Sequence, residues 1–133
     1  MATANNLDEL FRIARDAAQR AYNPYSHFSV GCAIQSSSGK IYAGCNIENA
    51  SFGVTLCAER VAGSKAVFDQ DFEWQTIVVV SPQGVSCCGI CRQFIHEFAP
   101  NAEVWVGFLD PQKTTHGPTK ICDLLPGGMT LDH

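Results

Sequence analysis

The first part of the chain has the spacing of an amphipathic helix. Apolar side chains recur three and four residues apart, a period of about 3.6 residues that places them on one helical face. Asn6 followed by Glu9 resembles a capping box at the start of this segment. Asn23-Pro24 is typical of a helix end, because proline cannot continue the hydrogen-bonded ladder. The pattern therefore predicts an opening helix over residues 6–22.

Four apolar runs further along the chain predict β-strands. Residues 28–34 and 40–45 flank a turn of serine and glycine, which predicts a hairpin. Residues 76–80 read Thr-Ile-Val-Val-Val, and a continuous β-branched run is typical of a central strand buried on both faces. Residues 103–108 form the last of the four runs.

Helical and polar segments separate these strands. Residues 56–68 and 89–98 are predicted to be helices, and residues 119–124 a last helical turn. Residues 46–55 and 115–118 are predicted to be loops, because they are polar and contain glycine. The order α-β-β-α-β-α-β predicts an α/β fold in which helices pack on the faces of one sheet.

Length and composition favour one globular domain over residues 1–133. The chain is 46% hydrophobic and 17% charged, which is enough apolar material for a single core. Its formal net charge is -4, so it lacks the basic surface that holds a phosphate backbone. A small neutral molecule is therefore a better expected substrate than a nucleic acid.

The N-terminus and the cysteines indicate a cytoplasmic protein. The first ten residues have neither a basic region nor a long apolar run, so we expect no signal peptide, and no segment is apolar enough to span a membrane. Seven cysteines without regular spacing are typical of free thiols in a reducing compartment. Cys32, Cys45 and Cys122 are predicted to be small buried hydrophobic side chains.

The other cysteines have the spacing of a metal site. Cys57 is followed two positions later by Glu59, and Cys88 and Cys91 form a CxxC pair further along the chain. A structural zinc has four protein ligands, whereas a catalytic zinc has three and keeps a position for water. A glutamate beside that position can move the protons that hydrolysis requires. These residues therefore predict hydrolysis or deamination.

Both cysteine groups are predicted to open a helix, where the positive end of the helix dipole favours a thiolate. Residues two apart on a helix point about 200° from each other, so Cys57 and Glu59 can share a site only if Cys57 lies at the helix mouth. Thr55 is a candidate N-cap that would place it there. Arg60 and Arg92 are expected to draw charge from the sulfurs.

Histidine is the residue that would change this interpretation. His27, His96, His116 and His133 are expected to be surface or capped side chains. If His27 completed a Cys3His site, the metal would be structural, and the chain would be a zinc-binding interaction module without an enzyme activity. Cys87 adds a second alternative, because it could compete with Cys88 as a ligand.

The sequence resembles the cytidine deaminases of the small, homotetrameric type over nearly its whole length. The resemblance is carried by five segments: Phe28-Ser-Val-Gly31, Gly44-Cys-Asn-Ile-Glu-Asn-Ala-Ser-Phe52, Cys57-Ala-Glu-Arg60, Cys88-Gly-Ile-Cys-Arg-Gln93 and Leu124-Leu-Pro126. It implies a three-layer α/β/α fold with a five-stranded mixed sheet. It also implies one zinc ion on Cys57, Cys88 and Cys91, with Glu59 as the proton shuttle.

The resemblance further implies a nucleoside site shared between subunits. It assigns substrate binding to Phe28, Asn46, Glu48 and the backbone of Ala58, and it implies that Ala50 and Phe52 reach into a neighbouring subunit. Asn46 and Glu48 also suit this role chemically, because an amide and a carboxylate can bind the two hydroxyls of a sugar diol. The family usually has proline at the position of Cys87, and many relatives have an aromatic residue in the region of Met129.

The expected activity is therefore hydrolytic deamination of cytidine and 2′-deoxycytidine to the uridine products and ammonia, a hydrolase reaction of pyrimidine salvage. The main rival is deamination of another aminopyrimidine nucleoside, such as a nucleoside antibiotic with a modified sugar. The second rival is the structural zinc-binding module.

Overall fold

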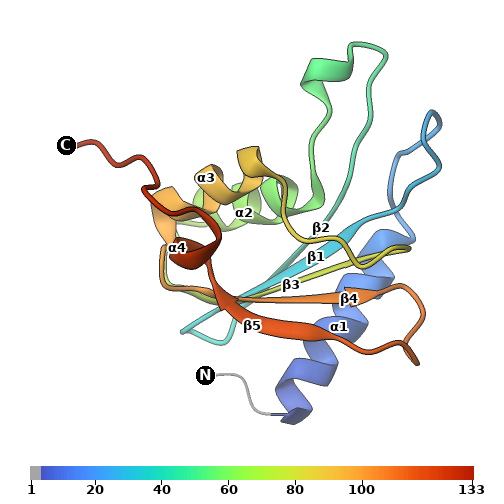
Figure 1. The fold of residues 1–133 in the computed structure, drawn as a ribbon, viewed down its shortest axis with the longest axis horizontal. Helices are drawn as coiled ribbons and strands as arrows, with labels where there is room; N and C mark the ends of the chain where they lie inside the picture. The colour runs from blue at the N-terminus through green and yellow to red at the C-terminus, as the bar shows by residue number, and fades with distance from the viewer. Residues whose placement is uncertain (1–3) are drawn as a thin grey trace.

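The computed structural model describes residues 4–133 and contains one five-stranded sheet (Figure 1). The strands lie in the order β2-β1-β3-β4-β5. Only the β3–β4 pair is parallel, so the sheet is mixed, as predicted. The five strands are β1 (Gly31–Ser36), β2 (Ile41–Cys45), β3 (Trp74–Ser81), β4 (Glu103–Phe108) and β5 (His116–Lys120).

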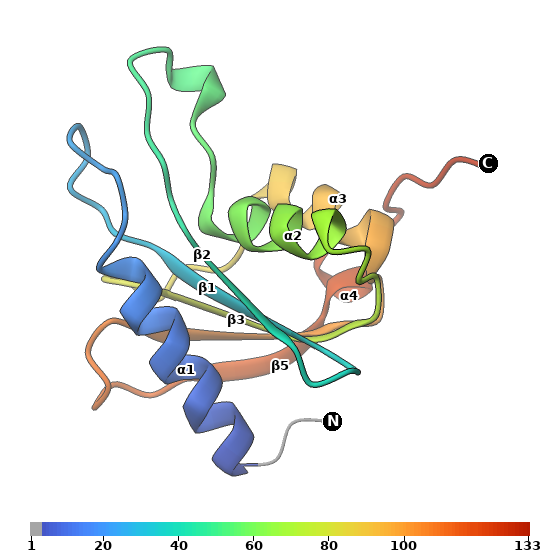
Figure 2. The same cartoon turned by 180° about the vertical axis from the view of Figure 1, so that it is seen from behind.

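Helices cover both faces of the sheet. Helix α1 (Ala4–Ala18) lies on one face, and α2 (Ala58–Phe68) and α3 (Gly89–Phe98) lie side by side on the other (Figures 1 and 2). The short helix α4 (Ile121–Leu124) follows β5 and lies near α3. The predicted three-layer α/β/α architecture is therefore confirmed.

The alternation of side chains along β3 divides the core into two parts. Ile77 and Val79 pack toward α2 and α3, whereas Val78 and Val80 pack toward α1, and all four are almost completely buried. This is the central strand that the β-branched run predicts. Because β3 is apolar on both sides, it anchors both helical layers to one element.

Two glycines let the helices approach the sheet closely. A Cβ atom on Gly31 would lie 1.9 Å from the carbonyl oxygen of Ala14 in α1. A Cβ atom on Gly44 would lie 2.5 Å from the carbonyl oxygen of Ala58 and 2.5 Å from the amide nitrogen of Ala62, both in α2. Helix α2 therefore rests on the backbone of strand β2, and this contact fixes the position of its N-terminus.

The structure corrects the predicted ends of the first helix. It ends at Ala18 rather than at residue 22, because the amide of Tyr22 donates to the carbonyl of Asn46 (3.0 Å) in a parallel bridge with the segment at Ile47. Asn6 lies inside the helix and not at its cap, and its side chain contacts Gln35. Residues 1–3 lie outside the described residues, so the prediction of no signal peptide is not tested at these positions.

The last strand was not predicted from its pattern. Strand β5 covers most of the segment that was expected to be a loop at residues 115–118. All five of its residues are exposed, so it lacks the alternation of apolar and polar side chains that marks a half-buried strand. Within the described part of the chain, every helix is too short or too polar to cross a lipid bilayer.

Candidate metal centre and active site

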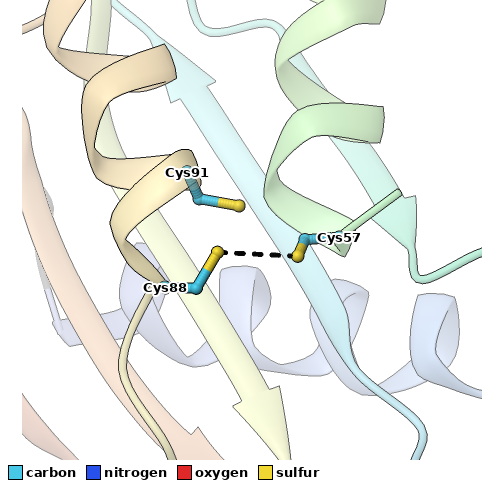
Figure 3. Close-up of side chains that lie close together, drawn as sticks. All are labelled: Cys57, Cys88 and Cys91. Atoms are coloured by element: carbon cyan, nitrogen blue, oxygen red, sulfur yellow. Dashed lines mark hydrogen bonds between the residues drawn. The ribbon is translucent and has the colours of Figure 1, made fainter. Parts of the chain in front are cut away.

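Three cysteine side chains meet where helices α2 and α3 begin (Figure 3). Cys57 is the N-cap residue of α2, Cys88 is the N-cap residue of α3, and Cys91 lies in the first turn of α3. The three Sγ atoms lie within 4.8 Å of one another, and those of Cys57 and Cys88 are 3.7 Å apart. Neither N-cap side chain caps its own helix, so both sulfurs are free to face the shared point.

This donor set suits a zinc ion with an open coordination position. Thiolates are good zinc ligands, and three protein ligands are the number found in catalytic sites. Among residues 4–133, no fourth histidine, cysteine or carboxylate joins the group. His27 is outside it, so the structure offers no Cys3His site there.

The electrostatics of the cluster also favour a bound cation. Hydrogen bonds from Cys91 and Arg60 lower the pKa of Cys57 to about 5. The same contact with Cys57, together with burial, raises the pKa of Cys91 well above its usual value. Three sulfurs this close repel one another when all are ionised, and a divalent cation compensates that repulsion. The residues present therefore fit a zinc ion.

Glu59 lies in the first turn of α2, two residues after Cys57, and is only 3% exposed. Burial raises the pKa of its carboxyl group, and the buried thiol of Cys87 lies beside it. Cys87 thus belongs to the core next to Glu59, whereas Cys88 joins the metal-binding group. Cys57 itself, rather than Thr55, occupies the N-cap position of the helix.

The two arginines differ in what they contact. The Nη2 atom of Arg60 donates to the Sγ atom of Cys57 (3.6 Å) and to the carbonyl oxygen of Thr55 (3.1 Å). Arg92 donates to main-chain carbonyls instead, from Nε to Cys87 (2.8 Å) and from Nη1 to Leu124 (2.9 Å). Arg60 therefore acts on the sulfur directly, whereas Arg92 fixes the loop that leads into Cys88.

Three of the residues expected to bind substrate, Phe28, Asn46 and Glu48, belong to one hydrogen-bonded network. Asn46 is 8% exposed; its Oδ1 accepts from the amide of Val30 (2.9 Å), and its Nδ2 donates to the carbonyl of Phe28 (2.8 Å). The amide of Glu48 donates to the carbonyl of Tyr22 (2.8 Å). The segments at 22–30 and 46–48 are therefore held together by the Asn46 side chain and by backbone hydrogen bonds.

The carboxylate of Glu48 binds the loop that precedes Phe28. Its Oε1 atom accepts from the amides of Tyr25 (3.0 Å) and Ser26 (3.1 Å), and its Oε2 atom accepts from the Ser26 hydroxyl. These donors hold the pKa of Glu48 below its usual range, with the Ser26 hydroxyl as the largest cause. Ser26 was not predicted from the sequence, because a serine in an exposed loop has no pattern of its own.

The same network continues to the metal centre. Ile47 and Leu56 exchange two backbone hydrogen bonds of 2.9 Å, and Leu56 directly precedes Cys57. Ala58, the next residue, is completely buried. Between these anchors, the segment 48–56 extends away from the body and carries the short helix η1 (Phe52–Val54) near its tip (Figures 1 and 2). Phe52 is 88% exposed there, and Ala50 lies in the same exposed segment.

The segment around Met129 is attached to helix α3 by the side chain of Gln93. Gln93 donates from Nε2 to the carbonyl of Met129 (3.0 Å) and accepts at Oε1 from the amide of Met129 (3.1 Å). The Met129 side chain is 64% exposed. Gln93 lies two residues after Cys91, so the attachment is close to the metal centre in sequence.

Together these features define a zinc-binding hydrolytic site, with three thiolates and one buried carboxylate on an α/β/α sandwich. The family described as "Cytidine and deoxycytidylate deaminase zinc-binding region" matches residues 4–107. The chain therefore belongs to the cytidine and deoxycytidylate deaminase family.

Similar proteins of known name agree with this assignment. The chain is 40% identical over 129 residues to the cytidine deaminase of Sporosarcina psychrophila, covering 96% of this chain and 93% of that one. Among solved structures, it resembles cytidine deaminase from Burkholderia pseudomallei, with a TM-score of 0.86, 37% identity, and coverage of 92% of this chain and 98% of that one. It is also 33% identical over 108 residues to the blasticidin-S deaminase of Bacillus cereus, covering 74% of this chain and 76% of that one.

Proposed function

We propose that this protein deaminates cytidine and 2′-deoxycytidine hydrolytically, giving the uridine products and ammonia. The observation that carries the proposal is the position of Glu59, buried in the first turn of α2 beside a group of three thiols with no fourth ligand in residues 4–133. The named relatives support cytidine as the substrate.

Cys57, Cys88 and Cys91 would hold the zinc ion. When bound, zinc lowers the pKa of a coordinated water and supplies a nucleophile at neutral pH. The contact from Arg60 to the sulfur of Cys57 draws negative charge from that ligand. The N-termini of α2 and α3 act in the same direction, because unpaired amides and the helix dipole favour the thiolate form.

Glu59 is proposed to carry the protons of the reaction. A cytosine ring must gain a proton at N3 before its C4 carbon is attacked, and the departing amine must then be protonated. A buried carboxyl group with a raised pKa can accept a proton and return it near neutral pH. Exclusion of bulk water around Glu59 keeps the transferred proton within the site.

The substrate is proposed to lie against Phe28, Asn46, Glu48 and the backbone of Ala58. The backbone contact between Ile47 and Leu56 supports this arrangement, because it ties the polar pair Asn46 and Glu48 to the segment that enters Cys57. The hydrogen bonds that Glu48 accepts from Tyr25 and Ser26 reduce its free acceptor capacity, so we propose that it binds one sugar hydroxyl rather than a diol.

A homotetramer is proposed as the active form, with Ala50 and Phe52 completing the site of a neighbouring subunit. The support is the projecting segment 48–56 and the high exposure of the Phe52 side chain, because a large aromatic residue gains much from burial at an interface. We expect Phe52→Ala to shift the protein to smaller species in sedimentation equilibrium and to lower its activity per subunit. Unchanged assembly and activity would contradict this part of the proposal.

We further propose one deaminase domain over residues 1–133 and a role in pyrimidine salvage in the cytoplasm. None of the seven cysteines, which all lie within residues 4–133, forms a disulfide, which supports the reducing compartment. The net charge of -4 supports a nucleoside over a nucleic acid polymer.

A second candidate is deamination of an aminonucleoside antibiotic, which the similarity to blasticidin-S deaminase favours. A panel of cytidine, 2′-deoxycytidine and blasticidin S, each followed by ultraviolet absorbance with the zinc-loaded protein, separates the two functions. Glu59→Ala measured alongside should remove the cytidine signal. If the wild-type protein consumes only blasticidin S, the second candidate replaces the first.

A further inference from the structure

We propose that Ser26 is a positioning residue for substrate binding, acting through Glu48. Its hydroxyl donates to Oε2 of Glu48 and accepts from the amide of Phe28 (3.0 Å). Ser26 therefore links Glu48, the charged residue of the proposed nucleoside site, to Phe28, its aromatic residue. This inference rests on the proposed deaminase function, since Glu48 and Phe28 belong to its substrate site.

The direction of these hydrogen bonds fixes the role of the hydroxyl. A serine hydroxyl has one proton to donate and two lone pairs that accept. The amide of Phe28 can only donate, so it occupies a lone pair of Ser26. The single proton is then committed to the carboxylate of Glu48, which has no proton of its own when ionised.

The acceptor capacity of Glu48 makes this commitment important. An ionised carboxylate has about four acceptor positions. The amides of Tyr25 and Ser26 occupy two of them on Oε1, and the Ser26 hydroxyl occupies a third on Oε2. One position on Oε2 is left for a ligand. Ser26 thereby selects the side from which a sugar hydroxyl can approach Glu48.

Both backbone polar groups of Phe28, its amide and its carbonyl, are held by hydrogen bonds. Ser26 accepts from its amide, and Asn46 donates to its carbonyl (2.8 Å). His27, between Ser26 and Phe28, has a φ of 57°, which is a costly left-handed conformation for a residue with a side chain. Because residues 24–27 are exposed, hydrogen bonds rather than core packing must hold this turn.

The structure therefore distinguishes Ser26 from an ordinary turn serine. A hydroxyl that only stabilised the turn would affect folding and leave the affinity for the nucleoside unchanged. A hydroxyl that orients Glu48 affects the Michaelis constant for substrates that this carboxylate binds, while the chemical step at the metal centre keeps its rate. The KM and kcat of suitable variants separate these roles.

The experiment measures kcat and KM for cytidine on the zinc-loaded wild-type protein and on Ser26→Ala, Ser26→Thr, Glu48→Gln and the Ser26→Ala/Glu48→Gln double variant. Loss of a hydrogen bond to a charged group predicts that Ser26→Ala raises KM about tenfold. The kcat of Ser26→Ala should stay within about twofold of the wild-type value. Ser26→Thr keeps the hydroxyl, so its KM and kcat should both stay within about twofold of the wild-type values. Ser29→Ala is the matched control, because the Ser29 hydroxyl accepts from Asn23 (2.9 Å) in the same loop.

The double variant decides whether Ser26 acts through Glu48. The proposal predicts that its KM equals that of Glu48→Gln alone within about twofold, whereas independent effects would multiply. Multiplied effects, or an unchanged KM in Ser26→Ala, would overturn the inference and leave the deaminase function standing. A wild-type protein that does not consume cytidine would overturn both. If Ser26→Ala does not fold, Ser26→Cys replaces it, because a thiol has a similar size and is only a weak donor. The expected and the contradicting results are the same as for Ser26→Ala.

Discussion

Glu59 and Glu48 are the same residue type in opposite environments. Glu59 is 3% exposed inside helix α2, and burial raises its pKa. Glu48 lies at an exposed loop and accepts from two amides and a hydroxyl, which lower its pKa. The first environment favours a group that exchanges protons, and the second favours a permanent negative charge.

The two glutamates are also held by different kinds of structure. Helix α2, which carries Glu59, packs on the backbone of β2 at Gly44 and is fixed by the core. Glu48 is partly buried and is held by polar contacts to the exposed turn at residues 24–27. Changes at Glu59 should therefore affect the rate of the reaction, whereas changes at Glu48 should affect recognition of the substrate.

Glu59→Gln tests the chemical half of this comparison and should have the largest effect. Glutamine keeps the size of the side chain but cannot accept and return a proton, so kcat for cytidine should fall by about a thousandfold. Zinc content, measured by atomic absorption, should stay at one ion per chain. A kcat close to that of the wild-type protein would show that another group carries the protons.

Arg60→Ala tests whether the sulfur cluster needs its positive neighbour. The variant loses the donor to Cys57 Sγ, so its activity or zinc affinity should fall by about ten- to a hundredfold. Zinc affinity can be measured by competition with a chromophoric chelator, and circular dichroism should show an unchanged fold. Arg92→Ala is the informative comparison, because Arg92 contacts only main-chain carbonyls among its described bonds.

Glu48→Gln tests the recognition half. The amide keeps most of the shape but loses the charge that strengthens its hydrogen bonds, so KM for cytidine should rise about tenfold. The kcat should change much less than it does in Glu59→Gln. A large loss of kcat with an unchanged KM would mean that Glu48 takes part in the chemical step and not in recognition.

The pH dependence of Glu48 should be the smallest effect. Its pKa lies below the ordinary value of 4.5, so the contribution of the carboxylate to the loop and to binding is present above that pH. The contribution is lost only as the pH falls through the lowered pKa. The KM of Glu48→Gln for cytidine, divided by the KM of the wild-type protein, should therefore stay constant above pH 4.5. A ratio that falls between pH 6 and pH 5 would contradict it.

The chemistry of the metal centre could be predicted from the sequence because it depends on local spacing. The CxxC pair and the separation of Cys57 from Glu59 limit how these side chains can meet at helix ends. The structure brings the three thiols together and places Cys57 at the N-cap, where the geometry required it. It also separates Cys87 from Cys88, which the sequence alone left as alternatives.

The features that could not be predicted from the sequence depend on contacts between distant segments. The first helix ends early because Tyr22 pairs with residues at 46–48, and no signal near Tyr22 indicates this partner. Strand β5 forms on the edge of β4 although its residues are exposed and include Gly117 and Pro118. The donors to Glu48 come from an exposed loop more than twenty residues away. Tertiary context decides such features, and local propensity does not reveal them.

The paired bonds between Gln93 and Met129 have a consequence for variation among related enzymes. Both bonds reach the main chain of residue 129, so the Gln93 amide acts like a neighbouring strand and tolerates any residue there except proline, which has no amide hydrogen to donate. Evolution can exchange the Met129 side chain, 64% exposed, without detaching the C-terminus from α3. The fold thus keeps one anchored position whose chemical character is free to change.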